Sequence, residues 1–162
     1  MELQRKIETG LLHLFHEEGV ESFSIASAAY NICKEADRTF LVVSVRCRRA
    51  TVIIQELEDL FHAEPWFEVI VDLADAEADL HEGAILYLSP GYDYVRDEHI
   101  TNFYYASHMS IEELKIEVLR FDESSARLRI DGLTGAAHGD ADTLFAIDSE
   151  FARDTNLKRS IR

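Results

Sequence analysis

The stretch TFLVVSVRC, residues 39–47, constrains the fold of this chain more than any other part of the sequence. Its β-branched residues and nearly continuous apolar character suit a buried strand better than a surface helix. The next segment, ATVIIQELEDLF (50–61), has helical period, and WFEVIVDL (66–73) again has the character of a strand. This succession predicts a βαβ-like unit; the competing interpretation is one long helix over 39–61.

The chain before this unit has the spacing of two helices, over residues 2–18 and 25–37. In each, apolar residues recur every three or four positions, and Gly19 is a plausible stop between them. We therefore expect a helical hairpin. At about 100° per residue, His13 and His16 fall opposite the apolar stripe of the first helix, which predicts that both face solvent rather than a metal ion.

From residue 84 onward the pattern is that of strands. In ARLRIDGL, Leu128 and Ile130 alternate with Arg127 and Arg129, as expected of a half-buried antiparallel strand. The predicted fold class is therefore α+β: an N-terminal helical hairpin, a βαβ-like unit, then a mostly antiparallel β-meander, packed as one domain over 1–162. Its residues 1–64 are expected to be mainly helical and residues 65–162 mainly β.

Charge is the strongest global signal in the composition. The 162 residues include 31 Asp and Glu against 16 Lys and Arg, for a formal net charge of -15. A field of this sign repels nucleic acid and anionic membranes and attracts basic partners. The N-terminus has no secretory apolar stretch, so the cytoplasm is the expected compartment.

Tyrosines and acids concentrate in one part of the chain, and this concentration predicts a surface that binds a basic protein. Five of the six tyrosines fall between residues 87 and 105, with acidic residues among them, and a further acidic cluster precedes them at 72–82. Tyrosine is frequent in interface hot spots because it combines area, rigidity and a polar tip. Consecutive strand residues face opposite sides, so one of Tyr104 and Tyr105 is a core candidate. The candidate partner-binding residues are Asp75, Glu77, Asp79, Tyr92, Asp93, Tyr94, Asp97, Glu98, Tyr104 and Tyr105.

A second hypothesis rests on HGDAD, residues 138–142. If this segment is extended, the side chains of His138, Asp140 and Asp142 point to one side and could hold a metal ion. The same residues also suit an ordinary connection between strands, where glycine and acidic residues are common.

These observations favour a non-catalytic, acidic binding protein over an enzyme. The chain has no nucleophile elbow, phosphate loop or dinucleotide fingerprint, and we expect no cofactor. The most concrete version is a bacterial immunity or inhibitor protein that neutralises a basic toxin or enzyme. The alternative is a small metal-dependent enzyme or ligand-binding domain that uses the 138–142 loop; a subunit that serves only homo-oligomerisation is the third.

Overall fold

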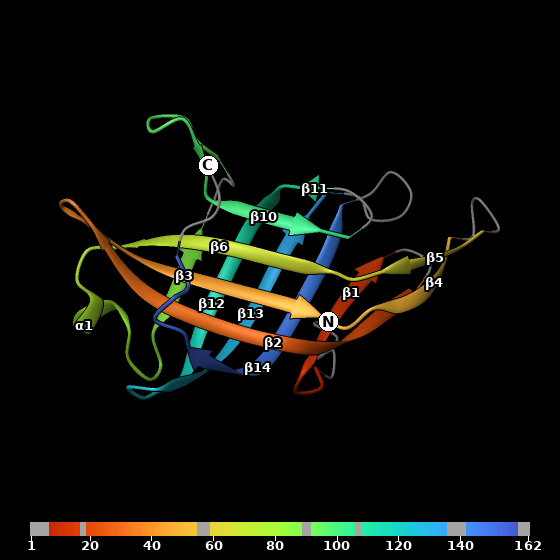
Figure 1. The fold of residues 1–162 in the computed structure, drawn as a ribbon, viewed down its shortest axis with the longest axis horizontal. Coiled ribbons are helices and arrows are strands. Elements are labelled where there is room, and N and C mark those ends of the chain that lie inside the picture. Colours follow the sequence, from red (N-terminus) through yellow and green to blue (C-terminus); the bar gives the residue numbers. More distant parts are fainter. Residues whose placement is uncertain are drawn as a thin grey trace, which may run out of the picture.

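Strands make up nearly all the regular structure in the computed structural model, which describes residues 7–16, 19–54, 59–88, 92–105, 108–135 and 142–158 (Figure 1). Within these residues the one helix is the single turn α1 (Ala76–Asp79). Ten strands form one sheet in the order β11–β10–β6–β3–β2–β1–β14–β13–β12–β7. Their neighbours pair antiparallel, except for a short parallel contact between β2 and β14.

The strands of this sheet differ greatly in length. Their bounds are β1 (Leu11–His16), β2 (Gly19–Glu35), β3 (Arg38–Cys47), β6 (Trp66–Leu73), β7 (Ile85–Leu88), β10 (Thr101–Tyr104), β11 (His108–Met109), β12 (Ile111–Phe121), β13 (Ser125–Thr134) and β14 (Thr143–Arg153). Two hairpins form separate two-stranded sheets: β4 (Ala50–Ile54) with β5 (Asp59–Ala63), and β8 (Tyr92–Asp93) with β9 (Glu98–His99).

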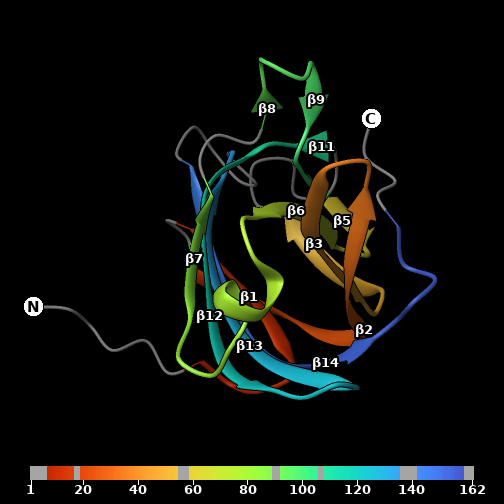
Figure 2. The same cartoon turned by 90° about the vertical axis from the view of Figure 1, so that its left-hand side faces the viewer.

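The sheet curls on itself, as Figure 2 shows from the side, and its strands share a main apolar core, with a second, smaller cluster at Phe40, Val42 and Ile70. Phe145 of β14 meets Phe67 of β6 and Phe103 of β10, with ring centroids 5.7 and 5.2 Å away. These strands are far apart in the strand order, so the contacts join opposite parts of the curled sheet. Burying such large aromatic side chains is a main source of stability for a fold with this much strand.

The predicted α+β class is wrong in its helical part. The described residues of the first predicted helix, 2–18, include β1, and the second, 25–37, lies mostly in β2. The third, 50–61, contains β4 and the first part of β5. The βαβ-like unit is wrong for the same reason, because β3 and β6 pair directly and antiparallel. The described residues of the 1–64 part are therefore mainly strand, not helix.

An irregularity in β2 explains why its period resembled that of a helix. The register with β3 shifts between Ile25 and Ser27, which marks a β-bulge or similar irregularity. An extra residue moves later side chains to the other face. As a result Phe23 and Ile25 before the shift, and Tyr30 after it, all contribute to the core, although strict alternation fails between them.

Two of the buried runs match the prediction. The run at 39–47 lies in β3, and WFEVIVDL is β6. In β13, Leu128 and Ile130 are buried while Arg127 and Arg129 are half-exposed, which confirms the predicted alternation.

Candidate partner-binding surface

The most distinctive surface feature is the β8–β9 hairpin with its turn, residues 92–99, which we call the arm. The Asp93 side chain fixes the turn: its Oδ1 accepts the backbone N–H groups of Val95 (2.9 Å) and Arg96 (3.1 Å). Arg96 Nη1 donates to the other oxygen, Oδ2, at 2.9 Å. These donors, led by the Arg96 backbone N–H, hold the pKa of Asp93 below its usual value. The arm is therefore ordered by one carboxylate.

Ion pairs attach the arm to the main sheet. Arg96 Nη1 also donates to Asp72 Oδ2 of β6 at 3.1 Å. Asp72 in turn accepts from Arg38 of β3, through Nε at 2.5 Å and Nη2 at 3.2 Å. Each exposed ion pair is worth little alone, but an alternating network of four charges restricts where the arm can lie. The series Arg38, Asp72, Arg96 and Asp93 thus connects β3, β6 and the arm.

The turn of the arm presents apolar surface to solvent. Tyr94 is 83% exposed and Val95 is 96% exposed, the highest values among the large hydrophobic residues described as exposed. Asp97 beside them is exposed and adopts a positive φ of 56°, a conformation that Asp tolerates better than most residues. An aromatic and an aliphatic side chain held out on a fixed turn form a suitable anchor for a protein partner.

Three of the predicted binding residues are described only through their backbones. Tyr92 and Glu98 contribute to β8 and β9, and Glu77 lies in α1. Their side chains lie outside the described part of the structure.

Tyr104, the last residue of β10, is half-buried, whereas Tyr105, which follows the strand, is buried. Tyr104 belongs to an outer cross-strand row in which Arg46, Trp66, Tyr104 and His108 are successive register partners. Arg46 lies 5.3 Å from the Trp66 ring, and the Trp66 and Tyr104 rings stack with centroids 6.1 Å apart. The rings therefore contact one another, so the row stabilises this sheet edge.

Tyr105 lies in the core and belongs to a polar cluster that the sequence did not reveal. Its hydroxyl donates to Glu21 Oε2 at 2.7 Å, and Glu21 Oε1 is 3.0 Å from His16 Nε2. Burial, followed by the Glu21 carboxylate, raises the pKa of Tyr105. Glu21 and Tyr105 are 84 residues apart, and no local spacing signals such a contact. Tyr105 is thus a structural residue rather than an exposed one.

His13 also differs from its predicted position, because β1 is a strand. It is 5% exposed, and its Nε2 accepts the Glu8 backbone N–H at 3.2 Å. The remaining ring nitrogen, Nδ1, therefore carries the proton and donates to Ser22 Oγ at 2.8 Å. Both nitrogens are occupied by hydrogen bonds within the protein, which leaves no position for a metal ion.

The acidic residues before the arm form a helical turn. Asp75 Oδ1 accepts the Ala78 backbone N–H at 3.4 Å, and Asp79 Oδ2 accepts the Asp75 N–H at 3.0 Å. The two carboxylates thus cap α1 while adding negative charge beside β7.

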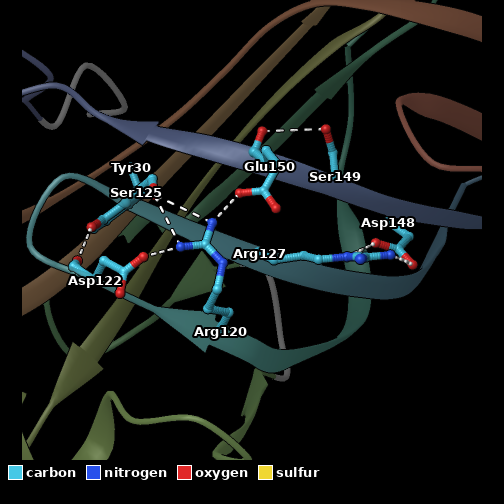
Figure 3. Close-up of polar contacts among 8 residues, drawn as sticks. All are labelled: Tyr30, Arg120, Asp122, Ser125, Arg127, Asp148, Ser149 and Glu150. Atoms are coloured by element: carbon cyan, nitrogen blue, oxygen red, sulfur yellow. Dashed lines mark hydrogen bonds and ion pairs between the residues drawn. The ribbon is translucent and has the colours of Figure 1, made fainter.

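Ion pairs between arginines and carboxylates lie on the outer face of β12–β14 (Figure 3). The Arg120 guanidinium lies between Asp122 and Glu150, and Arg127 forms a bidentate pair with Asp148 at 3.0 and 3.1 Å. These arginines are occupied by carboxylates. Bases are already half as numerous as acids, so pairing them leaves the excess acids to set the external field.

The predicted metal residues are described only in part. His138 and Asp140 lie outside the described residues, and Asp142 is exposed directly before β14. Among the residues whose positions are described, no group of three or more His, Cys, Asp or Glu side chains is arranged to hold a metal ion. The 138–142 metal site stays a prediction.

No family model, curated protein or solved structure matched the chain. Within the described parts of the chain, no helix has the length and apolar character that crossing a membrane requires.

Proposed function

We propose that this chain is a non-catalytic binding protein whose arm engages a basic protein partner in the cytoplasm. The observation that carries the proposal is the exposure of Tyr94 and Val95 on a turn fixed by Asp93 and Arg96. A rigid aromatic anchor binds with little loss of conformational entropy, because the turn is ordered before the partner arrives.

The charge of the molecule supports a basic partner. A net charge of -15 steers positively charged proteins toward the surface and repels acidic ones. Steering by charge and retention by an aromatic anchor are together what an inhibitor of a basic enzyme or toxin requires. We infer that the partner is of this class.

Affinity capture from the native host tests the proposal. The wild-type chain should retain a basic protein at low salt, and the double variant Tyr94→Ala/Val95→Ala should bind it roughly tenfold or more weakly. Both side chains are exposed, so the double variant should keep its thermal stability.

Leu144→Ala is the matched control for this experiment. Leu144 is a 46% exposed apolar residue of β14, away from the arm, and its removal should leave capture unchanged. Equal capture by the arm variant and the wild-type chain would contradict the proposal, as would retention of acidic proteins only.

A further inference from the structure

A second surface feature lies at the opposite end of the strand order from β10 and β11. Among the described residues, strand β7 is the last strand of the sheet and pairs on one side only, with β12 (Figure 2). Its register partners are Glu117 for Ile85 and Lys115 for Tyr87. In an antiparallel pair alternate backbone groups point away from the partner. No backbone hydrogen bond joins the free side of β7 to another described residue.

The side chains of β7 do not protect this edge. Exposed edges in native proteins usually carry lysine, proline or an inward-pointing charge, and Ile85–Leu88 contains none of these. Ile85 and Tyr87 face outward and are 46% and 74% exposed, whereas Leu86 and Leu88 pack against the core. The edge therefore offers apolar surface together with free backbone groups.

Acidic residues flank this edge at both ends. Glu82 precedes it and is exposed, and Glu112 and Glu113 precede Leu114, the partner of Leu88. Beside the strand itself, β12 carries Glu117 and Lys115, and their register partners on β13, Arg129 and Asp131, form an ion pair with each other at 3.5 Å. The nearby Arg120 is bound to Asp122 and Glu150. The charge around β7 therefore complements a basic segment.

We propose that β7 is a docking edge to which an extended, basic segment of the partner adds as a further strand. This inference rests on the proposed function, since it assigns a second contact to the same basic partner. Backbone hydrogen bonds to β7 supply affinity, and outward apolar side chains of the added strand lie beside Ile85 and Tyr87. A second copy of this chain is disfavoured as the occupant, because it brings the same acids to the same edge.

The test uses a synthetic peptide of alternating valine and lysine as the probe, followed by hydrogen–deuterium exchange of the chain. We expect the peptide to slow exchange at Ile85–Leu88. A peptide with the same side chains but N-methylated on alternate residues should bind roughly tenfold more weakly, because it cannot donate to the edge. A valine–glutamate peptide should not bind.

Three variants, and the chain measured without peptide, complete the experiment. Ile85→Pro removes a backbone donor and should weaken binding of the valine–lysine peptide. A proline at Leu144 would perturb an interior strand, so the control uses alanine at both positions. Ile85→Ala is compared with Leu144→Ala, because both side chains are 46% exposed. Of these two variants, only Ile85→Ala should weaken binding of the valine–lysine peptide. A dimer of the unmixed chain that Ile85→Pro dissociates would overturn the proposal, because the occupant would then be a second copy.

The failure of this inference can be distinguished from failure of the proposed function. Protection of the arm turn at residues 94–97 without protection of β7 would overturn the docking edge and leave the arm as the binding site. Equal binding of the N-methylated peptide would also overturn it. No protection at either place, with no capture of a basic protein by the arm, would overturn both.

Discussion

Gly132 shows at the residue scale how closely the core of the curled sheet is packed. A Cβ atom added there would lie 2.4 Å from Phe145 Cζ and 3.0 Å from the Glu113 carbonyl oxygen. Phe145 is buried and contacts two other phenylalanines, so its ring has little freedom to move away. Glycine at this position is therefore required by packing.

Gly132→Ala should lower the free energy of unfolding by about 1–3 kcal/mol, the usual cost of overpacking a core. Urea denaturation followed by tryptophan fluorescence measures the change. Gly135→Ala is the control, since its added Cβ would meet nothing closer than Met109 Cβ at 4.0 Å. Equal stability of the two variants would contradict the packing of β13 against Phe145.

Tyr105 gives a second prediction at this scale. Tyr105→Phe removes the hydroxyl that donates to Glu21 and leaves that partly buried carboxylate with one donor fewer. The free energy of unfolding should fall by about 1.5–3 kcal/mol, as for hydrogen bonds to charged groups. Tyr104→Phe, at the half-buried last residue of β10, should change it by less than about 0.5 kcal/mol. A larger loss of stability in Tyr104→Phe than in Tyr105→Phe would contradict the burial of Tyr105.

At the scale of elements, the strands show what local sequence could predict. Strands β3 and β6 pair with each other without a register shift, and both have the composition of buried strands. Their local sequence was sufficient to predict them as strands. The alternation at Tyr104 and Tyr105 was likewise a local signal. It indicated that one tyrosine would be buried, without indicating which.

The remaining elements depend on contacts that are remote in sequence. Strand β2 pairs with β1, β3 and β14, and its register shift after Ile25 produces helix-like spacing. The ion pairs that attach the arm to the sheet join Arg96 to Asp72, which is 24 residues away, and Asp72 to Arg38, which is 34 residues away. No period in the sequence encodes such remote contacts. The fold class was therefore wrong at β2, although five of the candidate binding residues lie in the arm: Tyr92, Asp93, Tyr94, Asp97 and Glu98.

The arm should respond to acid, because the pKa of Asp93 is lowered in the folded chain. A group with a depressed pKa stabilises the structure above its unfolded pKa, and that stabilisation is lost as the pH falls through the folded value. Acidification below the usual range of aspartate should therefore loosen the arm. Amide exchange at Val95 and Arg96, measured by NMR and corrected for intrinsic rates, should become faster.

Two variants separate the contributions of Asp93. Asp93→Asn keeps an oxygen that can accept the two backbone N–H groups but removes the charge that Arg96 binds. Asp93→Ala removes both. We expect arm protection to decrease in the order wild type, Asn, Ala, and the acid response to disappear in both variants. An unchanged acid response in Asp93→Asn would assign it to another carboxylate.

At the scale of the whole molecule, charge and shape have separate roles. The arginines of β12–β14 are taken up in ion pairs with carboxylates, and the acids around α1, β7 and the arm are in excess. The curled sheet holds the arm and the β7 edge on a rigid support. Long-range attraction should therefore govern how fast a basic partner arrives, and Tyr94 should govern how long it stays.

The most direct test of this account measures the association and dissociation rates of the captured partner as salt is raised. The association rate constant should fall by about tenfold or more between ~20 and ~200 mM salt, because screening shortens the reach of the acidic field. Tyr94→Ala should accelerate dissociation and leave association nearly unchanged. An association rate independent of salt, together with unchanged dissociation of the Tyr94→Ala complex, would contradict the account.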